Sequence, residues 1–155
     1  MNKRLKNGLL DLAGILFFFG CKQAKKNQAK FSGKDIDNVI KEMTATMIHD
    51  ITNPPLAARY FSYACLAGYE VVSQNNTSIK SMHGILNKYP DIKKPDSIKG
   101  YSVQLSALIA MIKTAEKIQP SGYLMSAYEQ RFLDSCKKAG FSDDEIESSV
   151  RYASY

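Results

Sequence analysis

The sequence predicts an all-α fold, a bundle of five to six helices that follows a disordered N-terminal tether. The first observation is that apolar residues recur at helical spacing, most clearly over residues 101–118 at Leu105, Leu108, Ile109 and Ile112. The second is that helix-start signals precede such segments and that Gly or Pro follows them. A chain of 155 residues is enough for one domain with one modest core.

Residues 1–20 have the composition of a secretion signal. Three basic side chains precede an apolar run over residues 9–19, which is too short for a membrane-spanning helix of ~20 apolar residues. We therefore expect a lipoprotein signal peptide over residues 1–20. The alternative is an uncleaved N-terminal anchor.

Cys21 is the expected lipid attachment site. The Phe-Phe-Gly-Cys sequence that ends at Cys21 is similar to a bacterial lipobox, in which a small residue precedes a lipidated cysteine that becomes the new N-terminus. It departs from that pattern at Phe18, where Leu is usual, and Asp11 interrupts the apolar run. Several acyl chains on Cys21 would anchor the protein stably in a membrane of the bacterial cell envelope, facing the periplasm or the exterior.

The segment over residues 21–31 is predicted to be a flexible, lysine-rich tether, because it is polar and has no periodic apolar pattern. The net charge of +6 comes from residues 1–34, since residues 35–155 carry 13 basic and 14 acidic side chains. The predicted helical domain, residues 32–155, is therefore nearly neutral. No basic stripe remains there that would favour nucleic acid as a partner.

One stretch, residues 47–70, contains the end of the first predicted helix and most of the second. A first helix, opened by Ser32 as N-cap, should end near His49, and Asn53 should cap a second helix whose first turn holds Pro54 and Pro55. Small and apolar residues then recur along one side of the second helix, at Ala57, Phe61, Ala64, Cys65 and Gly68. Because small residues let another backbone approach closely, we expect this helix to be central in the bundle.

The same stretch resembles a known family. Its pattern is an Asp, Asn-Pro-Pro, Ala-Ala-Arg-Tyr, a Tyr-Ala pair and Ala-Gly-Tyr-Glu. The residues of this structural motif are Asp50, Asn53, Pro54, Pro55, Arg59, Tyr63, Tyr69 and Glu70. This resembles the N-terminal helices of bacterial vanadium-dependent haloperoxidase-like proteins, which belong to the type 2 phosphatidic acid phosphatase (PAP2) superfamily. The resemblance is specific over residues 47–70, looser from residue 32 onward, and covers only the family's non-catalytic N-terminal part. The resemblance implies that the chain is the N-terminal part of an enzyme whose active site is missing from it.

The family builds its oxyanion site from three motifs, Lys-x6-Arg-Pro, Pro-Ser-Gly-His and Ser-Arg-x5-His. Lys and Arg neutralise the oxygens of vanadate or phosphate, and a histidine lies at the apex. This sequence has no Arg-Pro and no Ser-Arg dipeptide, and no histidine follows His83. We therefore expect no catalytic residue and no cofactor in this chain, with vanadate or phosphate bound only by full-length relatives.

Residues 120–123, Pro-Ser-Gly-Tyr, are similar to Pro-Ser-Gly-His but have Tyr123 in place of the acid/base histidine. A turn between two helices is the simpler interpretation, because Pro, Ser and Gly are common in turns. His49 and His83 are the only histidines, and neither has a second ligand at metal spacing. We expect structural roles for both and no metal site.

Two expectations concern side chains on the helices. Asp50, Arg59 and Glu70 are candidates for a partly buried ion pair or triad, since residues eleven apart on a helix share a face. Cys65 and Cys136 occupy positions typical of a helical core. We expect both thiols to be buried and reduced, although an envelope location would permit a disulfide.

The remaining chain is predicted to be helical apart from short connections. After a loop over residues 73–78, a helix over residues 79–89 should stop before Pro90, with apolar side chains on one side at Ile79, Met82, Ile85 and Leu86. Residues 91–99 should form a surface connection. Helices over residues 101–118 and 123–138 follow.

The strongest helix-start signal lies near the end of the sequence. Ser142 and Glu145 form a capping box, and Phe141 and Ile146 form a hydrophobic staple. No stop signal follows, so we expect this helix to run to the end of the chain. Tyr152 should then have little chain against which to pack.

Two classes of function remain. In the first, the chain is a truncated N-terminal fragment of a haloperoxidase-like or acid-phosphatase-like envelope lipoprotein, inactive alone. Its partners would be a membrane through the lipid on Cys21 and either a missing catalytic half or further copies of itself. In the second, it is a stand-alone helical lipoprotein that acts as a binding or structural module. An in-frame or frameshifted set of the three oxyanion motifs downstream of the gene would favour the first class.

Overall fold

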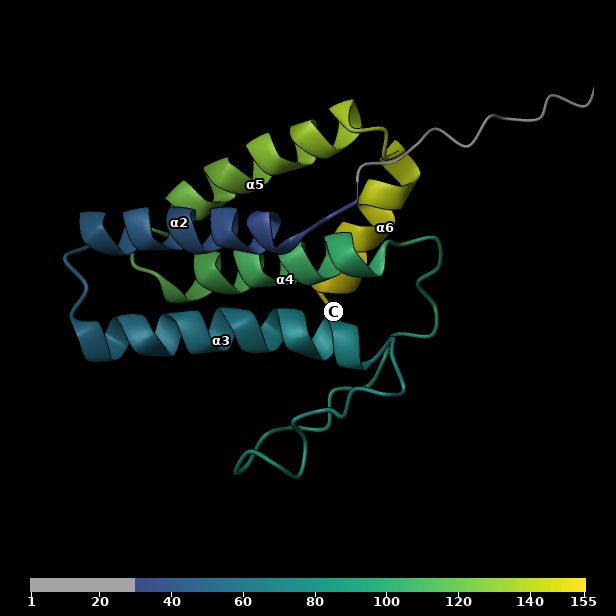
Figure 1. The fold of residues 1–155 in the computed structure, drawn as a ribbon, viewed down its shortest axis with the longest axis horizontal. Helices are drawn as coiled ribbons and strands as arrows, with labels where there is room; N and C mark the ends of the chain where they lie inside the picture. Colours follow the sequence, from purple (N-terminus) through teal and green to yellow (C-terminus); the bar gives the residue numbers. More distant parts are fainter. Residues whose placement is uncertain (1–29) are drawn as a thin grey trace, which may run out of the picture.

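The computed structural model describes residues 30–155, and this part of the chain consists of five helices joined by turns and one long connection (Figure 1). The helices are α2 (Gly33–His49), α3 (Pro54–Ser73), α4 (Val103–Ile118), α5 (Gly122–Lys138) and α6 (Asp143–Ala153). The predicted all-α class is confirmed. None of these helices is both long enough and apolar enough to cross a membrane. The predicted signal peptide, Cys21 and most of the predicted tether lie outside the described residues.

Helix α4 lies at the centre of the bundle, and α2, α3, α5 and α6 all pack against it (Figure 1). Its fully buried side chains include Leu105, Ile109 and Ile112. The expectation that α3 is the central helix is therefore wrong. Helix α4 carries apolar side chains around most of its circumference, whereas α3 keeps an exposed side that includes Arg59 and Tyr63.

The small residues of α3 do bring a second backbone close, as the sequence predicts. A Cβ added at Gly68 would lie 3.2 Å from the carbonyl oxygen of Ala107 on α4 and 2.8 Å from Cγ of Met111. Among the described helices, α3 and α4 share the most extensive contact. Glycine at position 68 therefore sets how closely these two helices pack.

The predicted helix starts are confirmed by their capping hydrogen bonds. Asn53 Oδ1 accepts the N–H of Leu56 at 3.1 Å, and Pro54 and Pro55 occupy the first turn of α3. At the start of α6, Ser142 Oγ accepts the N–H of Glu145 at 3.2 Å. These bonds satisfy N–H groups that have no partner within their own helices.

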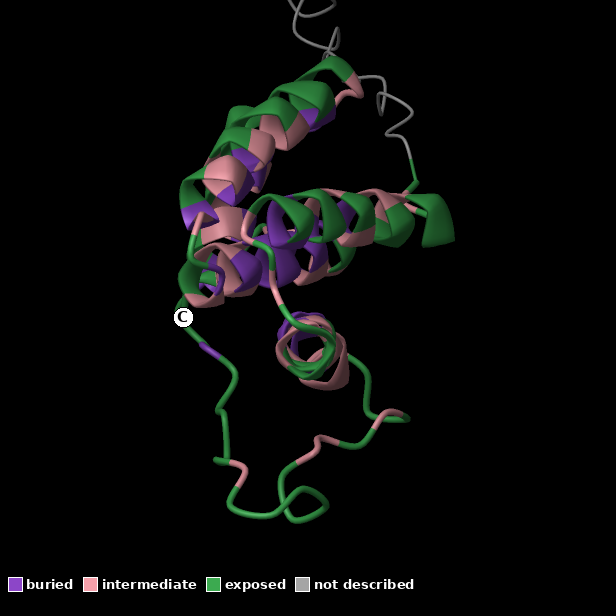
Figure 2. Cartoon of the chain, turned by 90° about the vertical axis from the view of Figure 1, so that its left-hand side faces the viewer, coloured by how far each residue is buried: buried purple, intermediate pink, exposed green. Residues whose placement is uncertain are grey.

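The predicted helix over residues 79–89 is absent, and residues 74–102 form one long connection between α3 and α4 (Figure 2). Gly84 has a φ of +78°, a left-handed conformation that interrupts a helix. Ile85 and Leu86 are exposed, so the expected apolar face has no core to pack against. A helix this short is only marginally stable without such packing.

Tyr152 on α6 is buried, contrary to the expectation that it would lack packing partners. Its ring stacks on Tyr101, with the ring centroids 4.0 Å apart. Its hydroxyl donates to Gln74 Oε1 at 2.8 Å and accepts from Asn75 Nδ2 at 3.0 Å. The two ends of the long connection, next to α3 and α4, therefore supply the contacts that the sequence did not reveal.

Candidate functional site

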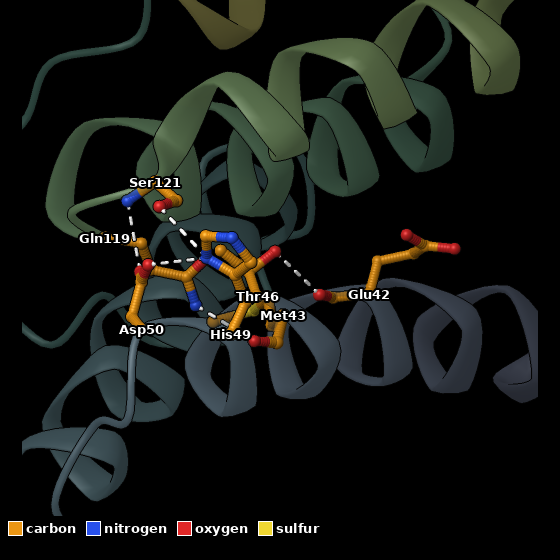
Figure 3. A network of polar contacts seen from close by, with 7 residues as sticks. All are labelled: Glu42, Met43, Thr46, His49, Asp50, Gln119 and Ser121. Atoms are coloured by element: carbon orange, nitrogen blue, oxygen red, sulfur yellow. Dashed lines mark hydrogen bonds and ion pairs between the residues drawn. The ribbon is translucent and has the colours of Figure 1, made fainter.

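Two neighbouring polar side chains, His49 and Asp50, meet the distant Ser121 where the end of α2 lies beside the turn between α4 and α5 (Figure 3). His49 is the last residue of α2, Asp50 is its C-cap, and Ser121 is the N-cap of α5. Gly122 permits the turn, because a Cβ at this position would lie only 1.9 Å from the carbonyl oxygen of Glu116. We call the set of His49, Asp50 and Ser121 the α2–α5 junction.

The Asp50 carboxylate holds the α2–α5 junction together. Its Oδ2 accepts the backbone N–H of Ser121 at 3.0 Å, and its Oδ1 lies 3.1 Å from His49 Nδ1. The same nitrogen lies 3.3 Å from Ser121 Oγ. The Asp50 side chain is only 5% exposed, whereas the imidazole of His49 is 56% exposed.

These contacts favour the charged form of Asp50. Hydrogen bonding from the Ser121 side chain is the main cause that lowers the pKa of Asp50, and burial works in the opposite direction. The Ser121 N–H and His49 lower the pKa further. The α2–α5 junction therefore contains a carboxylate that stays ionised at neutral pH.

The geometry does not provide a nucleophilic triad. In such a triad one imidazole nitrogen takes the proton of the hydroxyl while the other nitrogen donates to the carboxylate. Here the Asp50 carboxylate and the Ser121 hydroxyl both face the same nitrogen, Nδ1 of His49. When Nδ1 carries a proton and donates it to Asp50, this nitrogen cannot accept the proton of the Ser121 hydroxyl, so it cannot act as the base. Within residues 30–155, moreover, no group of three or more His, Cys, Asp or Glu side chains could hold a metal ion.

Gln119 forms a second, buried link between the same parts of the bundle. It is the C-cap of α4, and its Nε2 donates to the carbonyl oxygen of Met43 on α2 at 3.2 Å. Sequence analysis missed Gln119, because it belongs to no motif and its partner is 76 positions away. The α2–α5 junction and the Gln119 contact together fix the position of α2 against the turn between α4 and α5.

Two of the family-like residues hold the long connection rather than a catalytic site. The buried Glu70 carboxylate accepts the N–H of Met82 at 2.7 Å. The hydroxyl of Tyr69 donates to the carbonyl oxygen of Lys80, also at 2.7 Å. Both bonds tie the connection to the C-terminal end of α3.

The expected triad of Asp50, Arg59 and Glu70 does not form. Residues eleven apart share a helix face, but at 1.5 Å per residue they lie about 16 Å apart along the axis, too far for an ion pair. Arg59 is exposed, Asp50 binds Ser121, and Glu70 binds Met82. The structure therefore separates residues that the sequence motif grouped.

The expectation for the cysteines is correct for one and wrong for the other. Cys136 is buried in the core, and burial raises the pKa of its thiol to about 11. Cys65 is exposed, although helical spacing placed it on the apolar side of α3. Both thiols are free. Cys65 lines a hollow to which α2, α3 and α4 all contribute side chains.

This hollow is an apolar groove of about 500 Å³. Its walls come from the first turns of α2 and the second half of α3, and α4 forms its floor. The side chains that line it include Phe31, Ile36, Cys65, Val72 and Leu108.

No family model and no curated protein matches the chain. The chain does match a solved structure, described as the crystal structure of the first bacterial vanadium-dependent iodoperoxidase, with a TM-score of 0.75 and 27% sequence identity. The fold is haloperoxidase-like. The match covers 83% of this chain but only 31% of the iodoperoxidase chain.

Proposed function

We propose that this chain is the non-catalytic N-terminal helical part of a vanadium-dependent haloperoxidase-like or acid-phosphatase-like envelope lipoprotein, within the type 2 phosphatidic acid phosphatase superfamily. The observation that carries the proposal is the match of 83% of this chain to 31% of an iodoperoxidase. The pattern over residues 47–70, which resembles the N-terminal helices of that family, supports the same assignment.

The α2–α5 junction does not fit vanadate or phosphate. An oxyanion is bound by Lys, Arg and N–H donors around a histidine. His49 instead faces the carboxylate of Asp50, which repels an anion and already binds the N–H of Ser121. The sequence also lacks the Arg-Pro and Ser-Arg elements of the family's site. We therefore assign catalysis to the part of the full-length relatives that this chain does not match.

Reconstitution tests this assignment. The full chain alone should neither oxidise iodide with vanadate and peroxide nor hydrolyse a chromogenic phosphomonoester. Mixed with the catalytic part of a haloperoxidase-like protein, it should co-elute with that part in size-exclusion chromatography and increase its turnover. The proposal is wrong if the chain alone turns over substrate and loses that activity on His49→Ala or Ser121→Ala. It is equally wrong if the two parts do not co-elute and the chain does not change the turnover of the catalytic part.

The lipoprotein assignment has its own test. Expressed in a bacterium, the mature protein should begin at Cys21, carry acyl mass, and partition into the detergent phase. Cys21→Ser should abolish the acyl mass and leave an unprocessed precursor. A mature N-terminus at another residue with no lipid mass would contradict the assignment without affecting the proposed relation to haloperoxidases.

A stand-alone helical lipoprotein with a binding or structural role is the second candidate. The observation that favours it is the packing of α6, whose Tyr152 is buried and hydrogen-bonded by residues within the described domain. Such packing is expected of a domain that is stable without a partner.

A further inference from the structure

The long connection over residues 74–102 concentrates the positive charge of the described domain. It contains five lysines and two aspartates, a net charge of +3. The rest of residues 30–155 carries ten basic and twelve acidic side chains, a net charge of −2. Because charges of opposite sign are segregated, the connection presents a local positive surface on a nearly neutral domain.

The middle of this connection carries exposed apolar side chains, and we call residues 83–88 its tip. Figures 1 and 2 show the connection extending beyond α3, on the side of the molecule away from α5. At its tip, Ile85 is 62% exposed and Leu86 is 43% exposed. Exposed lysines flank them at positions 80 and 88. An apolar tip between cationic side chains matches the layering of an anionic membrane surface, where charged headgroups overlie acyl chains.

The base of the connection is fixed, so the tip is presented in a defined position. Glu70 binds the N–H of Met82, Tyr69 binds the carbonyl of Lys80, and Gln74 Nε2 donates to the carbonyl oxygen of Ile92 at 3.1 Å. Tyr69 and Glu70 lie in the last turns of α3, and Gln74 is its C-cap. They stop short of residues 85 and 86, which remain exposed.

We propose that the tip of the 74–102 connection docks on an anionic lipid bilayer. Ile85 and Leu86 enter the headgroup region, and Lys80 and Lys88 contact the lipid phosphates. The charge of the connection selects an anionic bilayer over a neutral one, and the exposed apolar pair distinguishes a bilayer from a purely charged partner. This contact does not depend on a lipid at Cys21, because it uses only residues of the described domain.

The sequence contains no tryptophan, so one introduced Trp reports the environment of one position. We compare Leu86→Trp with the matched control Ile48→Trp, whose position is 73% exposed at the end of α2. Both full-length variants carry the same residues 1–29, so any membrane binding by that segment affects both equally. With vesicles of phosphatidylcholine and phosphatidylglycerol, Leu86→Trp emission should shift to the blue and its quenching by acrylamide should fall several-fold. The Ile48→Trp signals should not change.

The lysines are tested in the Leu86→Trp background. Lys80→Gln with Lys88→Gln should abolish the blue shift, whereas the control Lys117→Gln, on exposed α4 surface, should preserve it. Circular dichroism checks that each variant remains helical. No shift on anionic vesicles, or an equal shift on phosphatidylcholine alone, would overturn the proposal. A blue shift that grows with protein concentration in the absence of lipid would also overturn the proposal. It would show that the tip binds a second copy of the chain.

Discussion

Asp50 joins two parts of the chain that lie 71 positions apart. Its carboxylate accepts the N–H of Ser121 and faces the imidazole of His49, so one side chain fixes both the end of α2 and the start of α5. The residue is thus structural, because its contacts join two elements of the bundle. Its ionisation makes this role measurable.

Asp50→Asn should lower the melting temperature at neutral pH. Because the contacts hold the pKa of Asp50 below its ordinary value of 3.8, its charged form favours the folded state. That contribution is present above pH 3.8 and is lost as the pH falls below it. The difference in melting temperature between the wild type and Asp50→Asn should therefore shrink in acid. Asp37→Asn, at an exposed position of α2, is the control and should leave the melting temperature at neutral pH unchanged. A difference that is constant with pH would contradict the assigned role.

Tyr152→Phe should reduce the free energy of unfolding by about 1–3 kcal/mol, since it removes a hydroxyl that bonds both Gln74 and Asn75 in a buried setting. The stacked ring on Tyr101 is retained, so the effect isolates the hydrogen bonds. Chemical denaturation followed by circular dichroism measures the change. Tyr123→Phe, at an exposed position, should be neutral. Equal effects of the two substitutions would show that the Tyr152 network contributes nothing specific.

At the scale of elements, the turn between α4 and α5 is defined by steric exclusion. The Pro120-Ser121-Gly122 sequence predicts a turn, and the structure adds that Gly122 lies against the carbonyl of Glu116 with no room for a side chain. The turn then places Ser121 beside Asp50. The position of α5 relative to α2 therefore depends on one glycine.

Gly122→Ala should destabilise the protein by about 1–3 kcal/mol, because the added methyl group must displace backbone in a packed turn. The control is Gly33→Ala in the first turn of α2, where an added Cβ would meet no atom within 4 Å. That control should be neutral or slightly stabilising, since Ala favours helices over Gly. Unfolding in urea measures both. A tolerated Gly122→Ala would mean that the turn relaxes freely and does not fix α5.

At the scale of the whole molecule, the described domain has a well-packed centre and apolar surface at its margins. The core surrounds α4, while the 500 Å³ groove opens between α2 and α3. Large apolar side chains are also exposed elsewhere, among them Ile48, Ile51, Ile85 and Tyr123. Exposed apolar patches of this kind usually mark a site for a partner.

The isolated full chain should be helical by circular dichroism, bind a hydrophobic dye, and self-associate. Adding the catalytic part of a haloperoxidase-like protein should abolish the dye fluorescence, because a partner covers apolar surface. Light scattering and dye titration measure both effects. A monomer with a sharp, cooperative thermal transition and no dye binding would instead favour the stand-alone lipoprotein.

Local signals in the sequence determined most of the helices. The Asn53 cap with Pro54 and Pro55, and the capping box of Ser142 and Glu145, act over three or four residues, so their positions in the sequence are enough to predict where helices begin. The apolar periodicity of residues 101–118 likewise predicted the helix that the structure shows as α4. The resemblance over residues 47–70 predicted a haloperoxidase-like fold, which the matched iodoperoxidase confirms.

The tertiary structure alone decided the long connection, the central helix and the junction around Asp50. The periodic apolar residues of 79–89 have the spacing of a helix, but a helix forms only where its apolar face meets a core, and Ile85 meets solvent. The pairs Asp50–Ser121 and Gln119–Met43 join positions more than 70 residues apart. Such contacts depend on how helices are placed in space, which caps and periodicity do not encode. Local hydrogen bonds therefore fixed the elements, and long-range packing determined which of their side chains meet.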